Sequence, residues 1–161
     1  MQFGHNDAGP LDDTARARGT IRGIGEDSVK TYNPIRKVNE TVYSFGWYMR
    51  KYIRETRQAG AIPIVCSPIP RNDWKNGKVL RSTESYAKWA KEVALAEGAL
   101  FIDLNDIVAL KYESMGAEAV KPFFPVDHTH TNLDGAKLNA SIVMENLLQL
   151  DVPKLRKFIK K

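Results

Sequence analysis

Cysteine is nearly absent from this sequence, and long apolar runs are missing altogether. Cys66 is the single cysteine in 161 residues, which excludes a disulfide within the chain and the disulfide-stapled scaffolds. No apolar run approaches the roughly 18 residues of a membrane-spanning helix, and the residues after Met1 do not resemble a signal peptide. A composition of 43% hydrophobic and 27% charged residues instead indicates a folded domain with its own core.

Most of the chain also lacks an excess of either charge sign. The net charge of +5 arises at the end, because residues 152–161 contain five lysines and arginines and no acid. The rest of the chain has equal numbers of basic and acidic side chains. We interpret residues 151–161 as a basic tail with a short helix over 154–160 whose charges face solvent. We therefore expect no nucleic-acid partner and no membrane association.

The middle of the chain repeats one pattern twice. Apolar spacing predicts a long helix over 38–59, and a short apolar run at 61–66 predicts a strand. A second helix is predicted over 84–97, capped by Ser82 or Thr83, and a second strand over 99–104. A glycine follows each helix. Repeated helix–strand units with continuously apolar strands indicate a parallel sheet covered by crossover helices.

Further helices are predicted over 105–115 and 133–150. Two long polar segments, 11–37 and 67–81, are predicted to be loops, and loops of that length are commonly functional. Ligands of parallel α/β sheets bind beyond the carboxyl ends of the strands. We therefore expect residues 4–10 and the loop at 67–81 to border the functional site.

The first cluster of residues that could take part in catalysis is Asp127 and His130, just before the helix at 133–150. A spacing of three lets the carboxylate meet the imidazole across a turn, which would fix one ring nitrogen and leave the other as a general base. A plain turn residue beside exposed histidines fits the same spacing. Metal binding by Asp127, His128 and His130 is a further alternative, although no fourth ligand of suitable spacing accompanies them.

The second cluster follows the short apolar start of the chain. Gly4 permits close backbone approach, and the side-chain amide of Asn6 can donate to a developing oxyanion. The alternative is an ordinary turn at the end of a strand, where Gly, Asn and Asp are the expected residues.

Taken together, the two clusters resemble a known family. Residues 3–7 (Phe-Gly-His-Asn-Asp) resemble the third sequence block of the SGNH, or GDSL-type, hydrolases, and residues 127–131 (Asp-His-Thr-His-Thr) resemble their fifth. Both extended forms look most like the rhamnogalacturonan acetylesterase branch, which removes acetyl esters from pectic polysaccharide. The resemblance implies a flavodoxin-like three-layer α/β/α sandwich with a parallel sheet and no cofactor.

The same resemblance assigns roles to particular residues. His130 resembles the general base, Asp127 the acid that orients it, and Asn6 the side-chain donor of the oxyanion hole. His5, beside Asn6, is placed at the border of the substrate. Full-length members of this type are commonly secreted or periplasmic, whereas the location of this chain stays open.

The sequence departs from the family pattern at the nucleophile. The family uses a serine in an N-terminal Gly-Asp-Ser block, and none of the seven serines here follows Gly-Asp. We therefore expect residues 1–150 to be the C-terminal portion of a single SGNH domain that is truncated at its N-terminus. We also expect the isolated chain to be inactive. A second copy or a partner chain would then cover the open edge of the sheet.

The expected substrate is an acetylated polysaccharide or oligosaccharide. Trp74, in the loop at 67–81, could stack on a sugar ring. Basic residues of both long loops could meet uronate carboxylates: Arg16, Arg18 and Arg22 in the first, and Arg71, Lys75, Lys78 and Arg81 in the second. Two other functions remain open. One is another SGNH acyl esterase or lipase, and the other is a non-catalytic binding module that keeps vestigial site residues.

Overall fold

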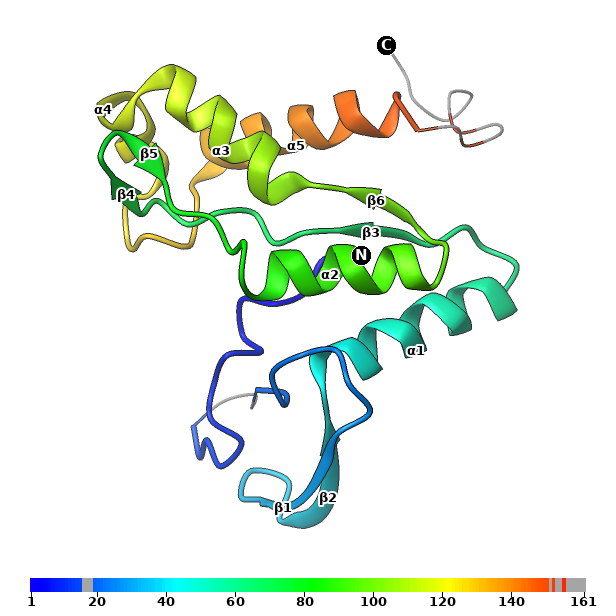
Figure 1. Cartoon of the computed structure of the whole chain (residues 1–161). Coiled ribbons are helices and arrows are strands. Elements are labelled where there is room, and N and C mark those ends of the chain that lie inside the picture. Colours follow the sequence, from blue (N-terminus) through cyan, green and yellow to red (C-terminus); the bar gives the residue numbers. More distant parts are fainter. Residues whose placement is uncertain (16–18, 151, 153–154, 156–161) are drawn as a thin grey trace. The chain divides into compact units, whose positions relative to one another are not determined.

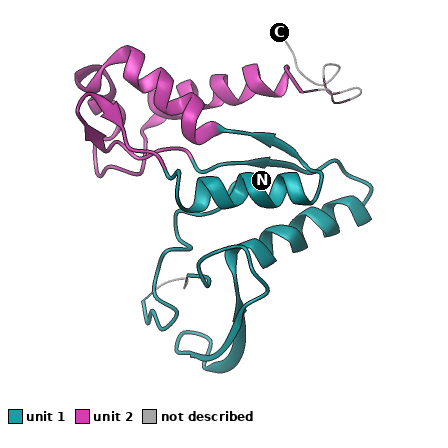
Figure 2. Ribbon diagram, in the orientation of Figure 1, with its two compact units in different colours: residues 1–68, 82–103 teal, residues 69–81, 104–161 magenta. Residues whose placement is uncertain are grey.

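A computed structural model describes residues 1–15, 19–150, 152 and 155. The chain divides into two compact units. Unit 1 contains Met1–Pro68 and Ser82–Asp103, and unit 2 contains Ile69–Arg81 and the chain from Leu104 onward. Figure 2 shows the two units in different colours. The chain therefore passes from one unit to the other three times.

The sheet of unit 1 is parallel and small. Strand β3 (Ile64–Cys66) pairs in parallel with β6 (Leu100–Ile102), with Val65 opposite Phe101 (Figure 1). Met1 lies along the other edge of β3: its ammonium group donates to the Ile64 carbonyl at 2.6 Å, and its carbonyl accepts from the Cys66 amide at 2.8 Å. Those two bonds follow the hydrogen-bond pattern of a parallel pair.

Two helices form the core of unit 1 with this sheet. Helix α1 (Phe45–Gln58) packs against α2 (Tyr86–Ala96), and α2 packs against β3 and β6. Burying a Val, Ile, Phe or Met side chain in this core stabilises the fold by roughly 1.5–3 kcal/mol. The buried side chains of this cluster are Phe45, Met49, Ile53, Val65, Tyr86, Ala90, Val93 and Ala94.

The single long helix predicted over 38–59 is wrong in its first part. Residues 38–43 form strand β2 (Val38–Tyr43), which pairs antiparallel with β1 (Ser28–Asn33). The β-branched residues of β2 favour a strand. Ser44 then starts the helix, because its hydroxyl oxygen accepts the Trp47 amide at 3.0 Å as an N-cap. The predicted loop at 11–37 likewise contains β1.

The other predicted elements of unit 1 have the right type and shifted ends. The strands predicted over 61–66 and 99–104 are shorter, at Ile64–Cys66 and Leu100–Ile102. Helix α2 begins at Tyr86, so Ser85 is the residue at its N-cap and neither Ser82 nor Thr83 is. Cys66 lies in β3, and burial raises the pKa of its thiol, which disfavours the reactive thiolate.

Unit 2 is mainly helical. It contains α3 (Leu104–Met115), α4 (Ala117–Val120), the 3₁₀ turn η1 (Lys121–Phe123) and α5 (Leu133–Leu147). Helices α3 and α5 pack together, and the buried Tyr112 hydroxyl donates to the Asn139 side-chain oxygen at 2.9 Å. Both helices occur where the sequence predicts them, with α5 ending three residues early.

The predicted loop at 67–81 contains a small hairpin. Strands β4 (Trp74–Lys75) and β5 (Lys78–Val79) pair antiparallel across Asn76 and Gly77. Both turn residues have positive φ, at 52° and 71°, as a two-residue hairpin requires. We call residues 69–81 the arm of unit 2.

The arm is attached to α3 by a nearly buried carboxylate. Glu113 accepts hydrogen bonds from Arg81 at 2.6 Å, from Lys78 at 3.0 Å and from the Val79 amide at 3.1 Å. The Arg81 guanidinium, followed by the Lys78 ammonium, lowers the pKa of Glu113 to about 2. Arg81 also binds Asp106 at 2.6 Å. These ion pairs hold the base of the arm against one helix.

The basic tail cannot be compared with the structure. The helix predicted over 154–160 lies outside the described residues, apart from Leu155. Within the part of the chain that is described, no helix is both long and apolar enough to cross a bilayer.

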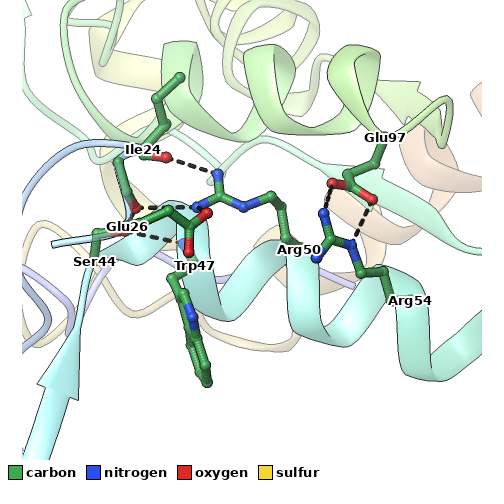
Figure 3. Close-up of polar contacts among 8 residues, drawn as sticks. Ile24, Glu26, Ser44, Trp47, Arg50, Arg54 and Glu97 are labelled. Atoms are coloured by element: carbon green, nitrogen blue, oxygen red, sulfur yellow. Dashed lines mark hydrogen bonds and ion pairs between the residues drawn. The ribbon is translucent and has the colours of Figure 1, made fainter. Parts of the chain in front are cut away.

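Two arginines of α1 attach that helix to other segments of unit 1 (Figure 3). The Arg50 guanidinium donates to the Ile24 carbonyl at 2.7 Å and to the Gly25 carbonyl at 3.0 Å, and it pairs with Glu26. Its side chain is only 14% exposed. Arg54, which is 61% exposed, makes a bidentate pair with Glu97 just after α2.

Replacing Arg50 by alanine should destabilise the protein more than replacing Arg54 by alanine. Loss of Arg50 leaves the Ile24 carbonyl without its donor, at a cost of about 1–3 kcal/mol, whereas the Gly25 carbonyl keeps the Ser44 hydroxyl. Loss of Arg54 removes an exposed pair that water and salt already weaken. Urea unfolding followed by circular dichroism measures both variants. Equal losses of unfolding free energy would contradict this assignment.

Candidate active site

One group of predicted site residues lies in a tight turn of unit 1. Gly4 has φ of +135°, and a Cβ at this position would lie 2.8 Å from Cγ of Pro68 and 3.0 Å from Cβ of Tyr86. Only glycine, which has no Cβ, both fits this space and adopts this positive φ without strain. The Asp7 amide donates to the Gly4 carbonyl at 3.2 Å and closes the turn around His5 and Asn6. Asn6 is exposed, and His5 is half-buried.

Asp7 anchors this turn. Its side chain accepts the Thr20 hydroxyl at 3.2 Å, and its carbonyl accepts the Thr20 amide at 3.0 Å. Burial raises the pKa of Asp7 above the ordinary aspartate value. Asp7 and Thr20 also line a cavity of 530 Å³ in unit 1, together with Phe3, Gly19, Arg36, Glu40, Thr41, Val42, Phe45, Tyr48, Met49 and Tyr52. No pattern in the sequence predicted this cavity.

Another group of predicted site residues is the Asp127–His130 pair, which lies in unit 2. One carboxylate oxygen of Asp127 lies 2.7 Å from Nδ1 of His130. The other accepts the backbone amides of Thr129 and His130, at 2.7 and 2.8 Å. The carboxylate and imidazole therefore meet across a turn, in the geometry that the spacing predicted.

This geometry fixes the proton on His130. An ionised carboxylate only accepts hydrogen bonds, so Nδ1 of His130 carries the proton and Nε2 of the neutral ring keeps its lone pair. The His130 ring, and then the two amides, hold the pKa of Asp127 well below its usual range. The side chain of His130 is 80% exposed, so Nε2 can meet a substrate. The pair has the arrangement of a general base and its orienting acid.

The chain after His130 is fixed by Asn132, the N-cap of α5. Its side-chain oxygen accepts the Gly135 amide at 3.0 Å, its amide side chain donates to the Pro122 carbonyl at 3.0 Å, and its backbone amide donates to the Phe123 carbonyl at 2.7 Å. Gly135 is packed tightly, because a Cβ there would lie 2.9 Å from Cβ of both Phe123 and Thr131.

A second aspartate–histidine pair lies beside the first. Oδ1 of Asp73, in the arm, lies 2.8 Å from Nδ1 of His128, and the Asn72 amide donates to the His128 carbonyl at 2.7 Å. Sequence reasoning did not predict this pair, since its partners are 55 residues apart. Trp74 of the arm is half-buried, and its Nε1 donates to the Asn72 side-chain oxygen at 2.6 Å.

The predicted site residues fall into both units. Asn6 and His5 belong to unit 1, whereas Asp127, His130 and Trp74 belong to unit 2. Ser67, a serine that follows a predicted strand, is fully buried, and its hydroxyl donates to Asp103 at 2.8 Å. Across the described residues, no three histidine, cysteine, aspartate or glutamate side chains gather as metal ligands would.

Comparison with known proteins identifies relatives of this chain. No protein-family model matches the sequence. It is 30% identical over 146 residues to the rhamnogalacturonan acetylesterase of Emericella nidulans. It is 26% identical over 165 residues to the probable rhamnogalacturonan acetylesterase YesY of Bacillus subtilis. The chain is related to the rhamnogalacturonan acetylesterases, which are SGNH hydrolases.

The alignments with these acetylesterases take in 90% and 99% of this chain but only 58% and 66% of the two relatives. The chain therefore spans about three fifths of the curated relatives that it matches.

A solved structure supports the predicted fold class. The crystal structure of Bacillus subtilis protein YXIM matches 65% of this chain and 30% of that chain, with a TM-score of 0.59 and 25% sequence identity. The predicted α/β class of the SGNH hydrolases is thereby confirmed, with short parallel strands in this chain.

Replacing Gly135 by alanine should destabilise unit 2, although alanine is the better helix former. The added methyl group meets the Cβ atoms of Phe123 and Thr131, which lie too near their backbones to move aside. We expect a loss of about 1–3 kcal/mol in unfolding free energy, as for other overpacked sites. Chemical denaturation measures this loss. Ser141→Ala, on an exposed face of α5, is the matched control and should leave stability nearly unchanged; a stabilised Gly135→Ala variant would contradict the packing.

Asp127 should stabilise the fold only in its ionised form. Because folding lowers its pKa, its contribution is fully present above the ordinary aspartate pKa of about 3.9 and is lost as the pH falls toward the folded value. The stability difference between wild type and Asp127→Asn should therefore be present at neutral pH and shrink below about pH 4.

Urea midpoints measured from pH 7 to pH 2 test this prediction. In a His130→Ala background the Asp127→Asn substitution should have a smaller effect, because the largest partner of the carboxylate is gone. A difference that grows as the pH falls would contradict the prediction.

Proposed function

We propose that this chain supplies the general base, its orienting acid and an oxyanion donor of a carbohydrate O-acetyl esterase that acts on acetylated rhamnogalacturonan-type pectin. The observation that carries the proposal is the Asp127–His130 pair, at 2.7 Å, in a chain related to rhamnogalacturonan acetylesterases. His130 is the proposed base, Asp127 the residue that orients it, and Asn6 the oxyanion donor. No cofactor takes part in the proposed reaction.

The proposed reaction has two steps. A serine hydroxyl attacks the acetyl carbonyl carbon while Nε2 of His130 takes the hydroxyl proton, and Asn6 donates to the oxygen that becomes negative. The ester bond breaks, and the sugar oxygen leaves with the proton from His130. Water then attacks the acetyl-serine with His130 again as base, so that acetate is released and the serine is restored.

The nucleophilic serine of this reaction lies, in our proposal, outside the 161 residues. No serine of the chain follows Gly-Asp, and the buried Ser67 cannot reach a substrate. The isolated chain should consequently show no esterase turnover of its own. In the complete protein, which we place in the secreted or periplasmic space, a Gly-Asp-Ser block would complete the triad.

The open edge of the sheet in unit 1 supports the need for additional polypeptide. Met1 pairs with the edge of β3 that faces away from β6, and among the described residues no strand pairs with the far side of Met1. Phe3, 41% exposed, stacks with Tyr52, 46% exposed, at 4.9 Å between ring centroids. We propose that a second copy, a partner chain or a further segment covers this edge and these rings.

For the substrate, we propose that the arm takes part in binding the polysaccharide. Trp74 offers an aromatic ring to a sugar, while the exposed Arg71 and Lys75 offer positive charge to uronate carboxylates. His5, in the turn of unit 1, is proposed to border the acetylated sugar.

Esterase assays on two forms of the protein test the proposal. The 161-residue chain should not hydrolyse a chromogenic acetate ester or acetylated pectic oligosaccharides above the buffer rate. The same chain, extended by an in-frame segment with a Gly-Asp-Ser block, should hydrolyse both. His130→Ala should lower kcat of the extended protein by at least about 10⁴-fold, as loss of a triad member does.

The control for this experiment is Lys137→Ala, on an exposed face of α5, which should retain full activity. Hydrolysis by the isolated chain that is lost in His130→Ala would overturn the assignment of the nucleophile. A preference for acyl thioesters over acetylated sugars would favour another SGNH acyl esterase. Glycan binding without turnover in the extended protein would favour a non-catalytic module.

A further inference from the structure

We propose that Asp73 is a positioning residue for the Asp127–His130 pair and that it acts through His128. The inference rests on the proposed function only in calling His130 the base, because the contacts themselves are properties of the folded chain. The arm would thus be more than a sugar-binding loop. It would set the place and direction of the imidazole that moves the proton.

The arm holds His128 by two different groups. The Asn72 amide donates to the His128 carbonyl at 2.7 Å, which fixes the main chain at that residue. The Asp73 carboxylate lies 2.8 Å from Nδ1 of His128, which fixes the direction of the ring. Both bonds come from adjacent residues of the arm and end on the residue between Asp127 and Thr129.

The loop around His130 needs an outside attachment because it has little packing of its own. His130 is 80% exposed and Val126 is 86% exposed, so apolar burial cannot hold this segment in place. The three bonds of Asp127 are internal to the loop and do not tie it to another element. Exposed pairs of this kind contribute little to order when nothing else holds the groups in place.

Two attachments to other elements supply that order. On the carboxyl side of His130, Asn132 binds the carbonyl groups of Pro122 and Phe123. On the amino side, the attachment is the arm, through Asn72 and Asp73. The segment from His128 to Asn132 is therefore held at both ends, and His130 lies between them. Releasing one end should increase the motion of the imidazole.

Hydrogen bonds and ion pairs hold the arm itself in a fixed conformation. Glu113 of α3 is only 7% exposed and binds Arg81, Lys78 and the Val79 amide at the base of the arm. At the other end, the Trp74 indole is tied to the Asn72 side chain at 2.6 Å. Asn72 therefore contacts both Trp74, the proposed sugar-binding residue, and the backbone of His128.

The protonated nitrogen of each of these two histidine rings can be identified by NMR. Because carboxylates accept, His128 and His130 must each be protonated at Nδ1, whereas the neutral ring in water favours the Nε2–H form. The chain has three histidines, so their ring nitrogens can be resolved and assigned in a ¹⁵N-labelled sample. The ring ¹⁵N shifts report which nitrogen is protonated, and water exchange of the Nδ1 proton reports how well it is held.

The test is Asp73→Asn in the 161-residue chain. In the wild type both rings should show the Nδ1–H form. In the variant His128 should lose that form. The Nδ1 proton of His130 should exchange with water about tenfold faster, because losing the charged hydrogen bond between Asp73 and His128 releases the amino side of its loop. Asp73→Glu, which keeps the charge, should restore part of the protection. Glu118→Gln, on the exposed surface of α4, should change neither ring.

Faster exchange at His130 in Asp73→Asn, reversed in part by Asp73→Glu, supports the positioning role. A change confined to His128, with His130 exchanging as in the wild type, overturns it. If Asp73→Asn fails to fold, His128→Gln cuts the same link at a side chain that is 51% exposed, and it should accelerate exchange at His130 equally. No turnover is measured, so failure of the esterase assay leaves this result unaffected.

Discussion

The hydrogen bonds accepted by the Asp127 carboxylate are the constraint on which the candidate site depends. One carboxylate accepts the imidazole N–H and two backbone amides, and so it shapes the turn and orients the ring at the same time. Because all of these donors favour the ionised carboxylate, the charge that a general base needs beside it is present throughout the neutral range. Asn132 on one side, and Asn72 and Asp73 on the other, attach this turn to the rest of unit 2.

The elements that the sequence predicts well are those decided by nearby residues. Asp127 and His130 are three positions apart, so their meeting depends on one turn, and the spacing offered this pair as one of the alternatives. The helices at α3 and α5 follow from apolar spacing in the same way. The Gly4 turn also belongs to this group, because its conformation is a property of one residue.

Other features depend on pairing with another segment, which the spacing of apolar residues within one segment does not reveal. Residues 38–43 have helical apolar spacing, yet they pair with 28–33 as a strand, since a neighbouring strand outweighs a weak periodic signal. Asn76-Gly77 is a hairpin signal that the sequence does contain, and it could have located β4 and β5. The Asp73–His128 pair has no local signal, because nothing in either segment specifies the other.

The path of the chain through the two units bears on the order of folding. The arm leaves unit 1 after Pro68 and returns to it at Ser82, while its partners in α3 and in the loop around His128 come later in the sequence. Closing such loops costs conformational entropy that grows with their length. The helices can form from local contacts, but the Arg81–Glu113 and Asp73–His128 contacts span 32 and 55 residues. We therefore expect the His130 imidazole to reach its final position late in folding, and during synthesis only after α5 has emerged.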